Sequence, residues 1–120
     1  QVNVTHCPDS KSGTPGSNTY KVKGNIHWIS AAEAIPAEVR LYDHLFSDPH
    51  PDSGDKNFLD AINPNSKQTI AAYLEPCMKD AKAEDRFQFE RHGYFVADKN
   101  DSKPGKPVFN RTVGLKDSWK

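Results

Sequence analysis

Apolar and polar residues alternate in several short runs along the chain, and this period of two is typical of β-strands. The clearest run is 36–46, PAEVRLYDHLF, where Val39 and Leu41 share one face and Arg40 and Tyr42 share the other. Further strands are predicted at 2–4, 19–30, 66–76, 86–98 and 108–115. The pattern therefore predicts a mainly β domain of six or seven short strands, typical of a Greek-key or barrel-like fold.

Loops rich in Pro, Gly, Ser and Asp separate these runs, at 8–18, 47–55 and 98–107. A short helix is predicted after the second loop, because Phe58, Leu59 and Ile62 fall on one helical face. Asp55 is suited to cap its start, and the Asn63-Pro64 pair ends it. Helical structure is thus expected only as short turns between strands.

Composition bounds the fold without naming a function. Apolar residues make up 35% of the 120 residues and the mean hydropathy is −0.81, which indicates polar loops or surface that a partner covers. No apolar run is long enough for a transmembrane helix. The first residues lack the pattern of a signal peptide and do not include an initiator Met, so the chain is expected to begin within a longer protein.

Neither the net charge nor the reactive side chains indicate a specific function. Sixteen basic and sixteen acidic residues give zero net charge, although the last third of the chain is mildly basic. Because no secretory signal is recognised, Cys7 and Cys77 are expected to be reduced thiols. Neither has a second Cys nearby, so no metal site is predicted. No nucleophile elbow, phosphate-binding loop or paired catalytic carboxylates are present, so the chain by itself is not expected to catalyse a reaction.

The stretch 86–98, RFQFERHGYFVAD, has polar residues that a solvated hairpin does not require. By strand parity Phe87 and Phe89 face one way and Gln88 the other, with His92-Gly93 as a two-residue turn. One interpretation is a half-buried hairpin with a solvated polar face. The other is that the Gln88 amide, which offers a donor and an acceptor side by side, reads a nucleobase edge beside an arginine that binds phosphate. Both interpretations remain open on the hairpin alone.

Longer stretches resemble a known family. Residues 21–46, 86–98 and 107–119, with FLDAINPNS and EPCMKDA between them, are similar in sequence and order to the C-terminal anticodon-binding region of bacterial-type glutaminyl-tRNA synthetase, a class I aminoacyl-tRNA synthetase. The resemblance covers about residues 20–119. Segment 8–18 matches poorly, as a variable loop would.

The resemblance implies a fold of two β-barrels that exchange strands. Residues 1–24 would then be the end of the first barrel and a variable loop, 25–106 the second barrel, and 107–120 a strand returning toward the first. The second barrel would be a six-stranded Greek-key β-barrel with short helical turns, like that of a large-subunit ribosomal protein. Its expected core includes Ile26, Trp28, Val39, Leu41, Phe87, Phe89 and Phe95.

The resemblance also implies a function and contact residues. The module would bind tRNA(Gln) in the cytoplasm, as a monomer without metal, membrane or cofactor, while a catalytic domain outside this sequence uses ATP to attach glutamine. Gln88 would contact the central anticodon uridine and Arg91 would lie at the anticodon. Ser118 would keep the hydroxyl of a family threonine, whereas His92 replaces a usual acidic residue.

Two other interpretations involve the same fold. The chain could be an RNA- or protein-binding barrel of a related glutamyl-tRNA synthetase, or a barrel of ribosomal type. Zero net charge counts against the ribosomal alternative, because a ribosomal RNA-binding protein is expected to carry a basic surplus.

Overall fold

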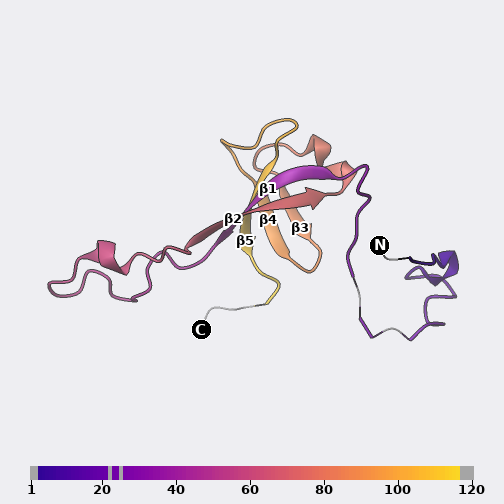
Figure 1. Ribbon diagram of the computed structural model, residues 1–120, viewed down its shortest axis with the longest axis horizontal. Coiled ribbons are helices and arrows are strands. Elements are labelled where there is room, and N and C mark those ends of the chain that lie inside the picture. The colour runs from indigo at the N-terminus through magenta and orange to yellow at the C-terminus, as the bar shows by residue number, and fades with distance from the viewer. Residues whose placement is uncertain (1–2, 22, 25, 117–120) are drawn as a thin grey trace.

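Five strands form one mixed sheet in a computed structural model that describes residues 3–21, 23–24 and 26–116 (Figure 1). The strands are β1 (Ile35–Tyr42), β2 (Lys67–Leu74), β3 (Arg86–Phe89), β4 (Gly93–Ala97) and β5 (Val108–Val113). The described residues also form three short 3-10 helices: η1 (Pro8–Ser10) precedes β1, η2 (Phe58–Ala61) lies between β1 and β2, and η3 (Pro76–Asp80) lies between β2 and β3. The prediction of a mainly β domain with short helical turns is confirmed.

The order of the strands across the sheet is β2-β1-β5-β4-β3. β1 and β2 pair antiparallel along their whole lengths, from Ile35 opposite Leu74 to Tyr42 opposite Lys67. The last strand, β5, lies in the middle, parallel to β1 and antiparallel to β4. Strand β5 therefore joins the β1–β2 pair to the β3–β4 hairpin.

Strands β2 and β3 are the two edges of this sheet, and they do not pair with each other. Closure into a barrel requires every strand to have two hydrogen-bonded neighbours. The described residues therefore form an open sheet rather than the expected closed six-stranded barrel. A hollow of about 380 Å³, which we call the seam hollow, lies between the two edges and is lined by apolar side chains of both strands.

The core lies on one face of the sheet, as the alternation predicts. Val39, Leu74, Phe95, Ala97 and Phe109 are buried together there, and Leu41, Phe87 and Phe89 pack against them half-buried. The rings of Phe89 and Phe95 stack with centroids 4.5 Å apart. Full burial of one such aromatic side chain contributes roughly 1.5–3 kcal/mol. Five of the seven expected core residues are confirmed in this cluster.

The other two expected core residues, Ile26 and Trp28, are wrong: their side chains are 85% and 77% exposed. Alternation buries a side chain only if the segment pairs with a sheet, and the described part of 19–30 forms no strand. The only polar contact between this segment and the sheet region that the structure gives for its described residues joins His27 Nε2 to Glu75 Oε1 at 3.3 Å. Val4 is exposed and outside any strand, and Val2 lies outside the described residues.

Residues 43–66 form an arm that projects from the sheet, on the opposite side from the N-terminal segment (Figure 1). A bridge between Phe46 and Ile62 holds the two sides of the arm together. The predicted helix is present as the single turn η2, but its cap differs from the prediction. Asn57, not Asp55, precedes the helix and accepts a hydrogen bond from the Leu59 backbone N–H.

Candidate nucleic-acid interface

The β3–β4 hairpin places Gln88 on the face of the sheet opposite the core. Phe87 and Phe89 are half-buried against the core, whereas Arg86 and Gln88 between and beside them are exposed. This confirms the strand parity predicted from the sequence. Gln88 lies directly opposite Tyr94 on β4, so the two side chains are neighbours on the outer face.

The turn of this hairpin differs from the predicted two-residue turn. Phe89 pairs with Gly93, which leaves three residues in the loop, and the His92 N–H donates to the Phe89 carbonyl at 2.9 Å. Arg91 at its centre has φ 66°, in the left-handed region that non-glycine residues disfavour. The reason for the difference is Gly93, which is the first residue of β4 and belongs to the strand rather than the turn.

Gly93 is required at its position by both conformation and space. Its φ is 136°, and a Cβ placed there would lie 2.5 Å from the Val113 carbonyl oxygen. The close approach lets β4 and β5 pair at a bulge next to Tyr94. This packing fixes the direction in which the Arg91 turn leaves the sheet.

Gln88 lines an outer-face hollow of about 510 Å³ together with Arg86, Tyr94 and Thr112, and it also lines the seam hollow. Among the described contacts, Gln88 has no hydrogen-bond partner and Arg86 has no ion-pair partner. Tyr94 is 44% exposed. An amide and a guanidinium without a partner among the described contacts, together with an exposed ring on the same face, can bind a splayed nucleobase and its phosphate.

Arg91 lines a different hollow from Gln88, of about 690 Å³, at one end of the sheet. Its only described ion pair joins its Nη2 to Oε1 of the neighbouring Glu90 at 3.6 Å, and both side chains are exposed. Such a contact contributes little, so the guanidinium remains available to an anion. The structure thus brings Gln88 and Arg91 to one hairpin but not into one pocket. The third predicted contact, Ser118, lies outside the described residues.

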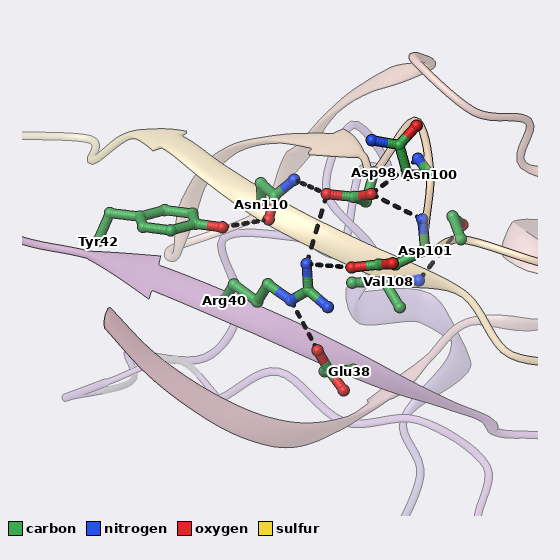
Figure 2. A network of polar contacts seen from close by, with 9 residues as sticks. Glu38, Arg40, Tyr42, Asp98, Asn100, Asp101, Val108 and Asn110 are labelled. Carbon is green, nitrogen blue, oxygen red and sulfur yellow. Dashed lines mark hydrogen bonds and ion pairs between the residues drawn. The ribbon is translucent and has the colours of Figure 1, made fainter. Parts of the chain in front are cut away.

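A polar network on the outer face was not predicted from the sequence (Figure 2). Arg40 on β1 donates to Glu38 at 2.7 Å and also approaches Asp101 at 2.7 Å and Asp98 at 3.5 Å. Asn110 on β5 continues the network by donating to Asp98 at 2.7 Å. Strand parity puts Arg40 on the polar face, but two of its three partners, Asp98 and Asp101, lie about 60 residues later in the chain, beyond the reach of any local pattern.

These contacts leave Arg40 unavailable for a ligand. Its side chain is only 15% exposed, and the hydrogen bond to Glu38, followed by that to Asp101, raises its pKa. The Asn110 hydrogen bond and backbone N–H donors lower the pKa of Asp98 to about 2. The network therefore holds β1, β5 and the 98–107 loop together, in contrast to the unpaired Arg86.

The described residues contain no group of three or more His, Cys, Asp or Glu side chains that could hold a metal ion. In the same part of the chain, no helix has the length and hydropathy needed to cross a membrane. Cys7 is half-buried, Cys77 is exposed, and both are free thiols in the structure.

Comparison with known proteins places this hairpin in a family. The model for "tRNA synthetases class I (E and Q), anti-codon binding domain" matches residues 25–98. Glutamine–tRNA ligase of Polynucleobacter necessarius is 92% identical over the whole chain, which covers 20% of that protein. The Ralstonia pickettii ligase is 75% identical over 98% of the present chain, which covers 20% of that ligase. The Nitrosomonas europaea ligase is 57% identical over the whole of the present chain, which covers 22% of that ligase.

The chain therefore spans about a fifth of the length of the curated relatives that it matches. The family match covers most of the sheet, including β1, β2 and the whole β3–β4 hairpin. On this evidence the chain belongs to the anticodon-binding domain family of the class I tRNA synthetases (E and Q).

Proposed function

We propose that this chain is the anticodon-reading module of a glutamine–tRNA ligase and that its partner is tRNA(Gln). The observation that carries the proposal is the Gln88 amide, which has no hydrogen-bond partner among the described contacts and stands beside an exposed Tyr94 ring. Family membership makes an anticodon the natural ligand of this surface. The identity of the relatives as glutamine–tRNA ligases selects tRNA(Gln) over other tRNAs.

The proposed reading works by direct contact with a base that has left its stack. The Gln88 carbonyl oxygen and amide N–H can pair with a donor and an acceptor on the edge of a uridine. Tyr94 can stack on a neighbouring base, and Arg86 can hold a phosphate. On the turn, Arg91 adds a second cation, and Ser118 is a third contact that the sequence resemblance supplies.

Attachment of glutamine belongs to the remaining four-fifths of the ligase in this proposal. That part would use ATP to activate glutamine, in the cytoplasm, while the present chain binds no cofactor and selects the tRNA. The purified 120-residue chain should therefore give only background pyrophosphate exchange with glutamine and ATP. Turnover above that of a mock purification would contradict the division of labour.

We also propose that the open sheet is part of a six-stranded barrel in the whole protein. Support comes from the seam hollow, where Ile70 and Leu74 of β2 face Phe87 and Phe89 of β3 across about 380 Å³. A further strand inserted there would pair with both edges and cover these apolar side chains.

The test of base reading is Gln88→Ala in the full-length ligase that contains this chain. Loss of a bidentate base contact should reduce discrimination for the central anticodon base by about 1–3 kcal/mol. The measurement is kcat/KM for aminoacylation of tRNA(Gln) against a transcript changed only at that base. Thr69→Ala, an exposed position on β2, is the matched control and should leave discrimination unchanged. Unaltered discrimination in a stably folded Gln88→Ala enzyme would reduce Gln88 to a solvated strand residue.

Arg91→Ala should have a different signature. If the guanidinium contacts phosphate, its loss weakens binding to all tRNAs alike and makes the salt dependence shallower by about 0.7–0.9 in slope. The measurement is the tRNA dissociation constant between low and moderate salt. A change confined to one anticodon sequence would instead make Arg91 a base-reading residue.

A further inference from the structure

The outer face of the sheet carries a second exposed aromatic ring besides that of Tyr94. Tyr42 is the last residue of β1, and its side chain is 43% exposed. Its hydroxyl group donates a hydrogen bond to Oδ1 of Asn110 on β5 at 2.7 Å (Figure 2). The ring is therefore fixed to the neighbouring strand while part of its surface remains open to solvent.

The polar network described above holds this ring in place. Asn110, which accepts the hydrogen bond from Tyr42, donates in turn to Asp98 at 2.7 Å. Asp98 lies 3.5 Å from Arg40, which is two residues before Tyr42 on the same strand. A side chain that is ordered before its ligand arrives loses less entropy on binding. The network that neutralises Arg40 thus also preorganises the Tyr42 ring.

The register of the strands places this ring on the same face as Gln88. One row of paired residues crosses β1, β5, β4 and β3, namely Arg40, Asn110, Val96 and Arg86. Tyr42 is two residues beyond this row on β1, and Gln88 is two residues beyond it on β3, so both side chains point to the outer face. Three strand spacings of about 4.8 Å separate them, which gives about 14 Å.

The surface between the two residues suits a nucleic acid. Thr112 on β5 is exposed and lines the outer-face hollow together with Gln88 and Tyr94. Its hydroxyl group donates to the Tyr94 carbonyl at 3.0 Å, which ties β5 to β4 on this face. Among the described residues that line this hollow there is no carboxylate to repel a phosphate.

We propose that the Tyr42 ring is a stacking platform for a second unpaired base of the anticodon loop, different from the base that Gln88 reads. This inference rests on the function proposed above and deepens it by one contact on the same face. Bases stacked directly on each other are about 3.4 Å apart, so a separation of about 14 Å requires a strand whose bases are splayed across β4 and β5. Stacking uses the π face that every base has, so Tyr42 adds affinity without selecting a base.

The first test measures the dissociation constant of a tRNA(Gln) transcript for the full-length ligase with Tyr42→Ala or Tyr42→Phe. Tyr42→Ala should weaken binding about 5- to 100-fold, equally for a transcript changed at the central anticodon base. The salt slope should not change, because no charge is lost. Tyr42→Phe keeps the ring and loses only the hydrogen bond to Asn110, so its loss should be smaller. Tyr20→Ala, at an exposed tyrosine outside the sheet, is the control and should bind normally.

The second test identifies the stacked base with transcripts that each lack one base of the anticodon loop. Tyr42→Ala and removal of the stacked base delete the same contact, so their losses should fail to add at one loop position other than the central anticodon base. Tyr42→Leu, which keeps an apolar side chain without a ring, should behave in the same way and answers the question if Tyr42→Ala fails to fold.

The outcomes separate this inference from the function on which it rests. Losses that add at every loop position overturn the stacking platform, as does normal binding by folded Tyr42→Ala or Tyr42→Leu enzyme. A loss confined to one anticodon sequence overturns it too, because stacking tolerates any base. If the unaltered ligase does not prefer the cognate transcript at all, the proposed function itself is wrong.

Discussion

Asp98 accepts hydrogen bonds from the backbone N–H groups of Asn100 and Asp101 and from the Asn110 side chain, and it lies beside Arg40 (Figure 2). Its side chain is 17% exposed. All of these donors favour the ionised carboxylate, which is why its pKa falls from 3.8 to about 2. One carboxylate thus links the 98–101 turn to two strands of the sheet.

This residue makes folding stability depend on pH. Because the folded pKa is lower than the unfolded one, the stabilisation is fully present above about pH 4 and is lost as pH falls toward 2. Asp98→Asn should lower the free energy of unfolding at pH 7 by about 1–2 kcal/mol and remove most of this acid dependence. Urea denaturation of the 120-residue chain at pH 7, 4 and 3 measures both effects. Asp52→Asn, an exposed arm carboxylate without a hydrogen bond in the described contacts, is the control, and an equal loss there would contradict the assignment.

The β3–β4 hairpin shows how an element can store strain at a position proposed to bind tRNA. Arg91 occupies the left-handed position of the turn at φ 66°, where glycine is the favoured residue. A non-glycine residue in this conformation costs roughly 1–2 kcal/mol. Strained residues of this kind cluster at functional sites, and the Arg91 guanidinium lines the hollow of about 690 Å³ at this end of the sheet.

Two substitutions in the hairpin should therefore act in opposite directions. Arg91→Gly should raise the free energy of unfolding by up to about 1 kcal/mol, since relief of strain exceeds the added entropy of the unfolded chain, while tRNA binding weakens. Gly93→Ala should lower it by at least about 2 kcal/mol, because a Cβ would lie 2.5 Å from the Val113 carbonyl oxygen. Thermal or urea unfolding of the two variants measures both changes. A destabilised Arg91→Gly chain would show that the arginine side chain, rather than the backbone, governs this turn.

Local pattern predicted the elements whose partners lie in the same sheet. The alternation at 36–46, 66–76 and 86–98 predicted β1, β2 and the hairpin, because their side chains are buried by neighbouring strands within this chain. The same alternation at 19–30 predicted a strand that the described residues do not form. Alternation reports that one face of a segment suits burial, but it does not say which surface buries it.

The candidate site likewise has features that local pattern predicted and features that it did not. The outward direction of Gln88 followed from parity alone. The Arg40–Asp98 network and the close approach of Gly93 to Val113 depend on register between segments distant in the chain, which no local window contains.

At the scale of the whole molecule, the shape departs from that of a compact domain. The radius of gyration is 19.7 Å and the extents are 66 × 36 × 29 Å. A compact domain of this length has a radius of gyration of about 14 Å. The excess comes from the arm and the N-terminal segment, which extend to opposite sides of the sheet (Figure 1). Both segments expose large apolar side chains, including Trp28, Leu45, Phe58 and Leu59.

Exposed apolar surface and two unpaired sheet edges suggest a test of how the sheet is completed in the longer protein. If a strand from elsewhere in the ligase enters the seam hollow, the outward N–H groups of β2 and β3 gain partners. Hydrogen exchange at these two strands should then be at least about tenfold slower in the full-length ligase than in the 120-residue chain. The reason is that each newly bonded amide exchanges only when the hydrogen bonds to the added strand break. Exchange at β5, which already has a neighbour on each side, serves as the internal reference and should change less. Circular dichroism must show that the isolated chain keeps its β content, so that the comparison concerns edges rather than folding. Equal exchange of β2 and β3 in the two proteins would mean that the sheet stays open and that the apolar hollow is covered by side chains alone.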